Sequence, residues 1–587
     1  MLTLRGASRL MEANDRYSTQ EIYASNHIYL SFTAYPQYPS TEIETENQLV
    51  LVEGAIYGKA QSALKKELSE LAAHLLSESD GDSYSSLRDW LLSTDGEYVV
   101  VFIDKSSEKF VVVNDSMGRL PLFFSERSDS ISISREQKFI IRASARSRLD
   151  PIGIAEYLVF SFNLAGRTMT DGITRFEPAT MVRFSPSRPP VKVRTLHEWV
   201  FGDDIDRKSD VTEHARRLAD MFIDATGNRI DVFPSLKPLL GLSGGLDSRA
   251  VLAGLLRTGV EFSAHTNLRS MRRSSEDMSV AEELVKVMEC DWRQYILSPE
   301  TLGAFVEVVR NQDGGNSSIM ATALESFKLL GRDYGYDTLY FTGDGGNQAM
   351  YPVLPAKALT SIDDLVEITA LTTHEFHPRI ASRLLRIDSD DLIGAIGSAL
   401  ESFPEADHDW KFGHYKIFGR AFRFIMEGED RVRFYFWLGA PFWDINILRL
   451  TMSIPDDQKS RFSLYTEFLK YLDPRALRVP YANIKARPTS MAASLYGALK
   501  TAVTRRPFLY RIARRLRSAK MGSRSKHAEL DSFIDRVVNR SELLPEYLDM
   551  DLLKKLRADK LSSIMYHQLN TIILRMHLTE IGYRKEP

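Results

Sequence analysis

The chain of 587 residues is too long for one hydrophobic core, and its apolar share of 44% and charged share of 26% are ordinary for a globular protein. A net charge of −3 excludes an overall attraction to nucleic acid, and the single cysteine, Cys290, excludes a disulfide framework and a cysteine-based zinc cluster. The N-terminal stretch has no apolar signal-peptide core, and no run reaches the roughly 18 apolar residues of a membrane span, so we expect a cytoplasmic protein.

The first 200 residues are predicted to be rich in β-structure. Runs of β-branched and aromatic residues lie at 27–35, 48–58, 95–115 and 120–136. The stretch 95–115 is typical of a hairpin, because a polar KSSEK turn joins its two Val/Phe-rich halves. Between the early strands, residues 63–79 (ALKKELSELAAHLLSES) have the spacing of an amphipathic helix. The SPSRPP stretch, Ser185–Pro190, indicates a linker.

From about residue 210, predicted helices alternate with short apolar strands. Helical patterns cover 211–230 and 248–259, and strands are predicted at 238–242, 261–267 and 337–343. This alternation predicts a parallel sheet with helices on both faces. After about residue 355 helices dominate, and the last 90 residues look helical and polar.

The stretch LLGLSGGLDS follows an apolar run and opens a predicted helix. Gly244 and Gly245 allow a tight turn and a close ligand approach, and the N–H groups of the turn and of the helix start favour an anion. Ser243 and Ser248 add hydroxyl donors, and Asp247 can hold Mg²⁺ beside phosphates. No lysine follows as in a Walker P-loop. The alternative is a glycine turn with a serine cap, without a ligand.

The full string SGGLDS is similar to the pyrophosphate loop of the ATP pyrophosphatases. Upstream, VEGAIYG (52–58) resembles the NGEIYN stretch of class II glutamine amidotransferase domains, and residues 95–125 resemble the hairpin that follows it, with Asp115, Gly118, Pro121 and Leu122 in matching places. A glutaminase-like domain before an SGGxDS domain is the order of the asparagine synthetase family, which the chain resembles over most of residues 20–490.

This resemblance implies the fold and its division. It implies an α+β, Ntn-hydrolase-like β-sandwich domain at 1–200. It also implies an α/β, Rossmann-like synthetase domain of the adenine nucleotide α-hydrolase type at 205–495, with a helical C-terminal extension at 496–587. TGDGGNQ (342–348) falls where the family has SGEGSDE, after a second apolar run. Both loops are therefore expected at the carboxyl ends of strands, where ligands bind in open α/β sheets.

The resemblance also implies the site residues. The ATP-binding set comprises Gly241, Leu242, Ser243, Gly244, Gly245, Leu246, Asp247, Ser248, Ala264, Thr342 and Gly343. Asp247 and Asn347 would hold Mg²⁺, Asn347 standing where the family has an aspartate. Asp344 could act as a general base, Lys485 could stabilise developing negative charge, and Arg431 could line the acceptor site. Alternatives are a turn residue for Asp344 and a solvated charge for Lys485, with Arg487 as its rival in a shifted alignment.

Two further residues near the loops each allow two interpretations. Arg249 could reach a phosphate, although an exposed helix arginine is commoner. His265 falls near the place where the family contacts adenine, although a lone histidine in such a position is more often simply packed in the interior.

The glutaminase chemistry of the family has no counterpart in this sequence. The family uses an N-terminal cysteine, but residue 2 is leucine, and the only cysteine lies at 290. The oxyanion-hole asparagine aligns with Glu53, whose carboxylate would repel a developing oxyanion. The strand that should carry the nucleophile is also absent, so we expect a domain that does not hydrolyse glutamine.

The resemblance predicts an AMP-forming carbon–nitrogen ligase that uses ATP and Mg²⁺. A small-molecule, sugar-acid or peptide carboxylate would be adenylated with release of pyrophosphate, and ammonia or another amine, free or supplied by a partner, would displace AMP. Alternatives are a non-catalytic relative that binds nucleotide or a partner protein, and an intramolecular cyclase of the β-lactam or lasso type. No nucleic-acid partner is expected. A homodimer, frequent in the family, stays open.

One basic stretch favours a location at the membrane. Arginines and apolar residues alternate along 505–520 in a spacing that suits a helix on an anionic membrane surface. The alternative is a solvated helix that packs on the synthetase domain.

Overall fold

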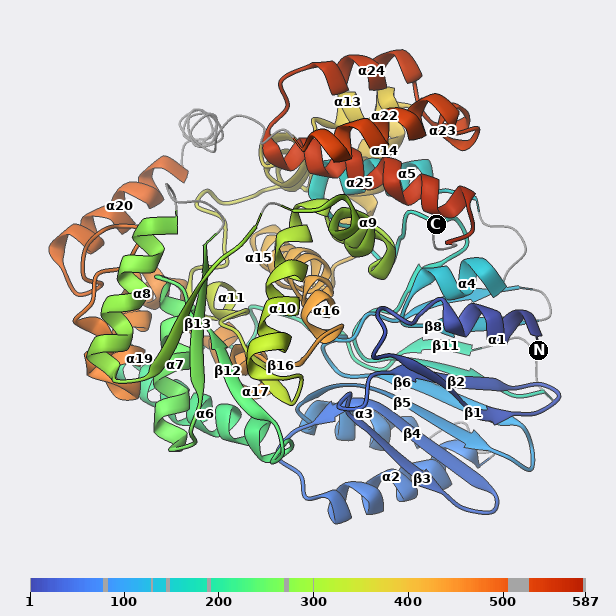
Figure 1. Cartoon of the computed structure of the whole chain (residues 1–587). Helices are drawn as coiled ribbons and strands as arrows, with labels where there is room; N and C mark the ends of the chain where they lie inside the picture. Colours follow the sequence, from blue (N-terminus) through green and yellow to red (C-terminus); the bar gives the residue numbers. More distant parts are fainter. Residues whose placement is uncertain are drawn as a thin grey trace.

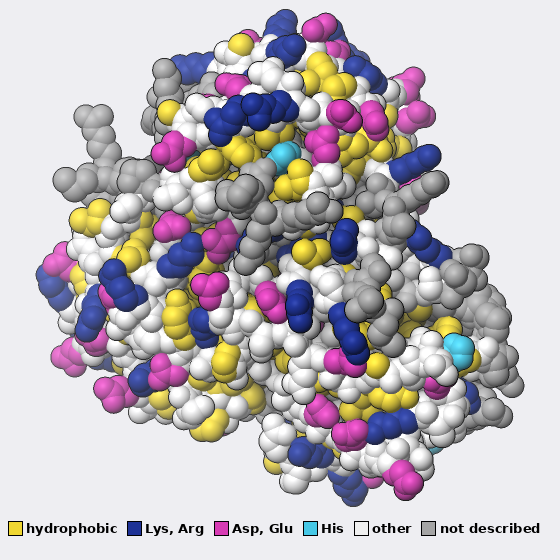
Figure 2. Space-filling view, turned by 45° about the vertical axis from the view of Figure 1, so that its right-hand side comes forward, with side chains coloured by type: hydrophobic (Ala, Val, Ile, Leu, Met, Phe, Trp, Pro, Cys, Tyr) yellow, Lys and Arg dark blue, Asp and Glu magenta, His cyan; other side chains and the backbone are white. Residues whose placement is uncertain are grey.

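The computed structural model describes residues 2–77, 83–127, 130–143, 148–186, 192–268, 274–298, 300–504 and 527–583. An antiparallel sheet lies at the lower right of Figure 1, a parallel sheet with its helices at the centre and left, and a group of helices across the top. On the face shown in Figure 2, acidic and basic side chains are interspersed over the surface of the described residues.

The N-terminal part is built on a six-stranded antiparallel sheet with the order β11-β10-β6-β5-β4-β3. Its strands are β3 (Ser40–Glu44), β4 (Gln48–Ile56), β5 (Gly96–Asp104), β6 (Lys109–Asn114), β10 (Thr180–Phe184) and β11 (Lys192–Thr195). Alternate side chains of β4 and β5, such as Val52 and Phe102, face α2 (Gln61–Leu76) and α3 (Ser83–Ser93), which cover one face of the sheet with Leu68 and Leu87. The predicted strands and helix are confirmed.

Smaller elements complete this part. They are α1 (Leu2–Arg9), the hairpin β1 (Ser18–Ala24) and β2 (Tyr29–Ala34), the three-stranded sheet of β7 (Phe123–Glu126), β8 (Ile131–Ser134) and β9 (Thr174–Arg175), α4 (Gln137–Ala143) and α5 (Pro151–Phe160). The hairpin packs on the other face of the six-stranded sheet through Leu30, Leu49 and Ile103.

The linker predicted at Ser185–Pro190 is wrong. Strands β10 and β11, on either side of it, pair with each other, Thr180 opposite Thr195 and Arg183 opposite Lys192. The proline- and serine-rich stretch therefore connects two neighbouring strands of one sheet, and residues 187–191 themselves lie outside the described residues. Proline and serine are common in hairpin connections as well as in linkers, so composition alone does not distinguish the two.

A five-stranded parallel sheet forms the second part, with the order β14-β13-β12-β15-β16. The strands are β12 (Lys237–Gly241), β13 (Ser263–Leu268), β14 (Asp291–Ile296), β15 (Thr338–Phe341) and β16 (Trp437–Gly439). The helices between and before them are α6 (Val211–Asp231), α7 (Leu246–Thr258), α8 (Ser274–Met288), α9 (Leu302–Asn311) and α10 (Ala321–Tyr334). The predicted parallel sheet is confirmed, but β14 and β16 were missed.

Helices dominate after β15, as predicted. They are α11 (Gly346–Met350), α12 (Ile362–Val366), α13 (Pro378–Leu384), α14 (Ser389–Glu401), α15 (His408–His414), α16 (Glu427–Arg433), α17 (Ile445–Ser453), α18 (Asp456–Lys459), α19 (Ser463–Leu472) and α20 (Met491–Thr504). A π-helical stretch, Tyr415–Met426, joins α15 to α16 without a break. Such wide turns are rare and often occur near functional sites.

The C-terminal helices are α22 (Ala528–Arg540), α23 (Leu543–Tyr547), α24 (Met550–Ala558) and α25 (Ser563–Glu580). Helix α25 is not the polar surface helix that composition suggested, because most of its length is buried beside α5 and α9 (Figure 1). The Gln568 amide donates to the Tyr157 carbonyl at 3.1 Å and to the Ser161 hydroxyl at 2.7 Å. The predicted membrane-surface helix at 505–520 lies outside the described residues. Within the described ranges, no helix is both long and apolar enough to cross a membrane.

Candidate active site

Two glycine-containing loops meet at the carboxyl ends of neighbouring parallel strands. Leu242–Gly245 connects β12 to α7, and Thr342–Gly345 connects β15 to α11. A Cβ at Gly343 would lie 2.6 Å from the Asp247 carbonyl carbon, and one at Gly346 would lie 2.5 Å from the Asp247 Cγ. Only glycine allows the second loop to approach Asp247 this closely.

The first loop is closed by its two serines. The Ser243 N–H donates to the Ser248 hydroxyl at 3.1 Å, the two hydroxyls lie 3.0 Å apart, and the Gly245 N–H donates to the Ser243 hydroxyl at 3.2 Å. Gly245 stands at the start of α7, and among the described residues no side chain caps that helix start. The helix dipole and the first N–H groups of α7 are therefore directed toward this loop, as an anion site requires.

Asp247 occupies the centre of the arrangement. Its Oδ1 accepts a hydrogen bond from the Tyr465 hydroxyl at 2.6 Å, and its Oδ2 accepts one from the Asn347 amide at 3.1 Å. Burial raises the pKa of the Asp247 carboxyl to about 7. The Tyr465 hydrogen bond opposes this rise, and the nearby negative charge of Asp344 adds to it. The carboxyl therefore sits where a bound cation would strongly favour its ionised form.

Asp344 and Arg431 approach the same tyrosine from two elements. The Asp344 N–H donates to the Thr342 hydroxyl at 3.3 Å. Burial raises the pKa of Tyr340 on β15, the charge of Asp344 adds to this rise, and the charge of Arg431 on α16 opposes it. Arg431 is half-buried and donates to the Gly428 carbonyl of its own helix at 2.6 Å. The structure thus places both residues beside the end of β15.

Lys485 lies on a loop that packs over the first glycine loop. The Ala482 N–H donates to the Gly244 carbonyl at 3.3 Å, and the Tyr481 N–H donates to the Ala486 carbonyl at 2.8 Å. Lys485 has a positive φ of 52° and is exposed, and so is Arg487. The structure therefore brings the loop that carries Lys485 to the candidate site.

The remaining predicted positions line the strands behind the loops. Ala264 on β13 is fully buried and pairs with Leu240 of β12. Gly241 gives room for the Tyr340 hydroxyl, which a Cβ there would meet at 2.4 Å. His265 is buried with its Nε2 3.1 Å from the Tyr340 hydroxyl, and burial lowers its pKa to about 4. The interpretation of His265 as a packed, neutral histidine is confirmed.

Both interpretations of Arg249 are wrong. The side chain is fully buried, so it is not an exposed helix arginine, and its hydrogen bonds go to backbone carbonyls outside the first glycine loop. Its guanidinium donates to the carbonyls of Ala476, Val479 and Pro480 at 2.7 to 2.9 Å. Arg249 therefore fixes the backbone that leads into the loop of Lys485.

Sequence reasoning missed three tyrosines that surround Asp247. Tyr465 donates to its carboxylate, and the Tyr351 and Tyr465 rings lie 5.8 Å apart. Burial raises the pKa of Tyr481, and the nearby charge of Asp247 adds to this rise. These residues come from segments more than 100 positions after Asp247, and nothing in the local sequence sets them apart from core tyrosines.

The described site residues do not form a complete set of metal ligands. Within the described part of the chain, no group of three or more His, Cys, Asp or Glu side chains is arranged to hold a metal ion. The oxygen donors at the junction of the two loops are those of Asp247 and Asn347, which suit a hard cation that also takes ligands from a substrate phosphate.

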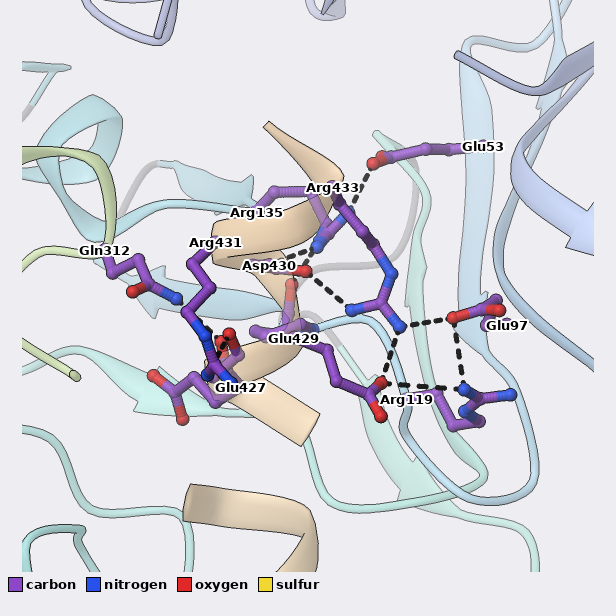
Figure 3. Close-up of polar contacts among 12 residues, drawn as sticks. Glu53, Glu97, Arg119, Arg135, Gln312, Glu427, Glu429, Asp430, Arg431 and Arg433 are labelled. Atoms are coloured by element: carbon purple, nitrogen blue, oxygen red, sulfur yellow. Dashed lines mark hydrogen bonds and ion pairs between the residues drawn. The ribbon is translucent and has the colours of Figure 1, made fainter. Parts of the chain in front are cut away.

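A second cluster of charges joins the N-terminal part to α16. We call it the interdomain charge network; it consists of Glu53, Glu97, Arg119, Arg135, Glu429, Asp430 and Arg433 (Figure 3). Arg433 contacts Glu97, and its Nη2 lies 2.8 Å from the Glu429 Oε2. Arg119 is 3.3 Å from Glu97 and 3.5 Å from Glu429, and the side chains of all four are at most 2% exposed.

The network reaches Glu53 through Arg135. That arginine contacts the Glu53 carboxylate with one nitrogen and lies 2.8 Å from the Asp430 Oδ2 with another, while the Tyr38 hydroxyl donates to Glu53 at 2.8 Å. Figure 3 shows Arg431 on the opposite side of α16 from Arg433. One short helix therefore carries network residues on one side and a candidate acceptor-site residue on the other.

We expect that Gly346→Ala weakens the binding of Mg-ATP by about 10- to 100-fold, because the added methyl group would displace the Asp247 carboxyl. The control is Gly394→Ala on α14, where a Cβ meets nothing within 4 Å. Isothermal titration of both variants checks this. Equal affinity of Gly346→Ala and the parent chain would show that nucleotide does not bind at the junction of the two loops.

Comparison with known proteins relates the N-terminal part to one family. Residues 29–192 match the sequence model of the glutamine amidotransferase domain. This range includes five of the six strands of the antiparallel sheet and ends at the first residue of β11. It lies within the first domain expected from the sequence, although it is less than a third of the chain. The N-terminal part is thus a domain related to glutamine amidotransferases. No curated protein sequence shows a significant match.

Solved structures add only weak likenesses. NMN synthetase from Francisella tularensis shares 14% identity at a TM-score of 0.19, over 35% of this chain and 93% of that one. Glutamine PRPP amidotransferase from B. subtilis shares 11% at 0.21, over 50% and 87%. The allosteric regulatory enzyme of purine biosynthesis shares 11% at 0.18, over 45% and 63%. Similarities this low carry no weight for fold or function.

Proposed function

We propose that the chain is an ATP-dependent amide ligase of the asparagine synthetase type, which adenylates a substrate carboxylate and forms an amide with an amine. The observation that carries this proposal is the meeting of the SGGLDS and TGDGGN loops around Asp247 at the carboxyl end of the parallel sheet. The positive end of the α7 helix dipole, which begins at Gly245, would favour a phosphate beside this loop.

The donor set suits Mg²⁺ beside phosphates. Asp247 and Asn347 would hold the cation, which would offset the negative charge of the phosphates as pyrophosphate leaves. The raised pKa of Asp247 supports this assignment, since perturbed carboxyls cluster where a ligand completes the charge balance. Asn347 contributes a neutral amide oxygen, so we expect weaker cation binding than with two carboxylates.

Three residues have roles in the second half of the reaction. Asp344 would accept the proton of the attacking amine, Arg431 would orient the acceptor, and Lys485 would stabilise the negative charge that develops on the acyl group. Their positions support these roles, because the charges of Asp344 and Arg431 both affect the pKa of Tyr340, and the loop that carries Lys485 contacts Gly244.

The N-terminal domain would not hydrolyse glutamine. The resemblance puts Glu53 at the oxyanion position, and its carboxylate, which is paired with Arg135, accepts hydrogen bonds and would repel an oxyanion there. Cys290 lies between α8 and β14 of the other part, and burial raises its pKa to about 11, which disfavours the thiolate. The amine would then come from solution or from a partner, and intramolecular cyclisation remains the alternative.

A non-catalytic role is the second candidate. It is favoured by the contacts of Asp247, since both of its carboxylate oxygens already accept hydrogen bonds from Tyr465 and Asn347. A protein that uses this site only to bind nucleotide or a partner would retain these contacts.

Pyrophosphate release decides between the two. The purified chain is incubated with Mg-ATP and a panel of small carboxylates, sugar acids and peptides, with ammonia as the amine, beside Asp247→Ala. Release of pyrophosphate that requires one carboxylate and is lost in Asp247→Ala supports the ligase. Binding of Mg-ATP without release across the panel supports the non-catalytic candidate. Glutamate formed from glutamine would contradict an inactive N-terminal domain.

A further inference from the structure

Helix α20 presents an apolar face to solvent. The exposed fractions are 88% for Met491, 70% for Leu495, 41% for Tyr496 and 63% for Leu499, at a spacing of about one helical turn. We call these four residues the α20 face. They are four of the ten exposed large hydrophobic residues of the described part of the chain, and the other six are scattered.

The helix contacts the protein through small residues. Ala493 is fully buried, and a Cβ at Gly497 would lie 3.1 Å from the Arg461 Cα. In Figure 1, α20 lies at the left edge, away from the antiparallel sheet, and it packs on the short helix Ser460–Phe462. The two inward positions that the structure describes thus carry small residues, whereas the large side chains of the α20 face are exposed.

The sequence around the helix carries a strong local positive charge. Residues 474–528 contain 14 Lys or Arg and no Asp or Glu, so the rest of the chain carries −17 (−3 minus 14). Arg478, Lys485 and Arg487, which precede the helix, are exposed. Residues 505–526 lie outside the described residues, and their sequence contains nine of these 14 Lys or Arg.

We propose that the α20 face rests on an anionic lipid surface. Exposed Met and Leu in a stretch of sequence rich in Lys and Arg match a bilayer interface, where acyl chains take the apolar side chains and anionic headgroups attract the basic ones. A nucleic acid would use the positive charge but would gain nothing from three exposed aliphatic side chains, and a second copy of the chain would bring its own basic stretch against this one.

Docking at this face would bring the candidate active site to the lipid surface. The helix directly follows the loop whose Ala482 N–H donates to the Gly244 carbonyl at 3.3 Å. A carboxylate or amine carried on a lipid anchor would reach the glycine loops from this side. The lipid contact itself does not depend on the proposed ligase function.

Vesicle flotation of the full chain tests the proposal. The vesicles are phosphatidylcholine alone or mixed with phosphatidylglycerol. We expect the parent chain to float with the anionic vesicles only, and Leu495→Glu to lower its partition coefficient at least about tenfold. The matched control is Ile296→Glu, because Ile296 is also exposed (69%) but lies on β14. Since both positions are exposed, both variants should fold, which thermal unfolding verifies.

Three results would overturn the proposal. The first is no flotation of the parent chain with anionic vesicles. The second is equal flotation of Leu495→Glu and the parent, which would leave the α20 face without a part in binding. The third is a parent dimer that Leu495→Glu dissociates in sedimentation velocity, which would assign the face to a second copy of the chain.

Discussion

Replacing Asp247 with asparagine is expected to stabilise the protein by up to about 4 kcal/mol at pH 8, while it abolishes the binding of Mg-ATP. The folded pKa of about 7 lies above the ordinary value of 3.8, so the folded state holds a proton that the unfolded chain has released between these two values. Stability therefore falls as pH rises from about 4 to 7, and asparagine, which does not ionise, removes this loss.

Denaturant unfolding at pH 4 and pH 8 measures the effect. The gain from Asp247→Asn should be near zero at pH 4 and largest at pH 8, and titration calorimetry should show no Mg-ATP binding at either pH. The control is Asp220→Asn on α6, an aspartate whose side chain is 68% exposed. A variant that is less stable than the parent at pH 8 would mean that the ionised Asp247 is well stabilised in the empty site and is not held for a cation.

Arg433→Met is expected to lower the free energy of unfolding by about 3–5 kcal/mol. The arginine contacts Glu97, Glu429 and Asp430 in the interior, and its removal would leave buried carboxylates without their principal cation. Burial already raises the pKa of Glu429 to about 7 against the opposing effect of Arg433 and Arg119, so the uncompensated carboxyl should take up a proton in the variant.

Denaturant unfolding of Arg433→Met and Arg431→Met provides the comparison. Both arginines lie on α16, but Arg431 is half-buried and its hydrogen bond goes to the Gly428 carbonyl of the same helix, so its replacement should cost less than about 1 kcal/mol. Equal losses for the two variants would refute the view that the interdomain charge network holds the two parts of the chain together.

The two glycine loops were accessible to sequence reasoning because their signals are local. LLGL and LYF are short apolar runs that end in glycine-containing turns, and parallel strands place such turns at the same edge of a sheet. The contact between the loops then requires glycine at 343 and 346, which the sequence contains. The assignment of Asp247 to the centre of the site rests on the same local pattern.

The remaining features depend on contacts between distant residues. Arg433 and Glu97 are 336 positions apart, and no local pattern distinguishes them from solvated charges. Arg249 was misjudged because a helix arginine is usually exposed, whereas here three backbone carbonyls satisfy it in the interior. Strand β16 has three residues, too few to show a period of two.

The burial of α25 beside α5 has a consequence for the synthesis of the chain. Gln568, which donates to the Tyr157 carbonyl, is translated 411 residues after it. At roughly 5–20 residues per second, α5 leaves the ribosome about 20–80 seconds before its partner helix exists. During that interval α25 does not yet cover the apolar side chains of α5. The nascent chain should therefore depend on a chaperone, and it should be prone to aggregation when translation slows near the end of the chain.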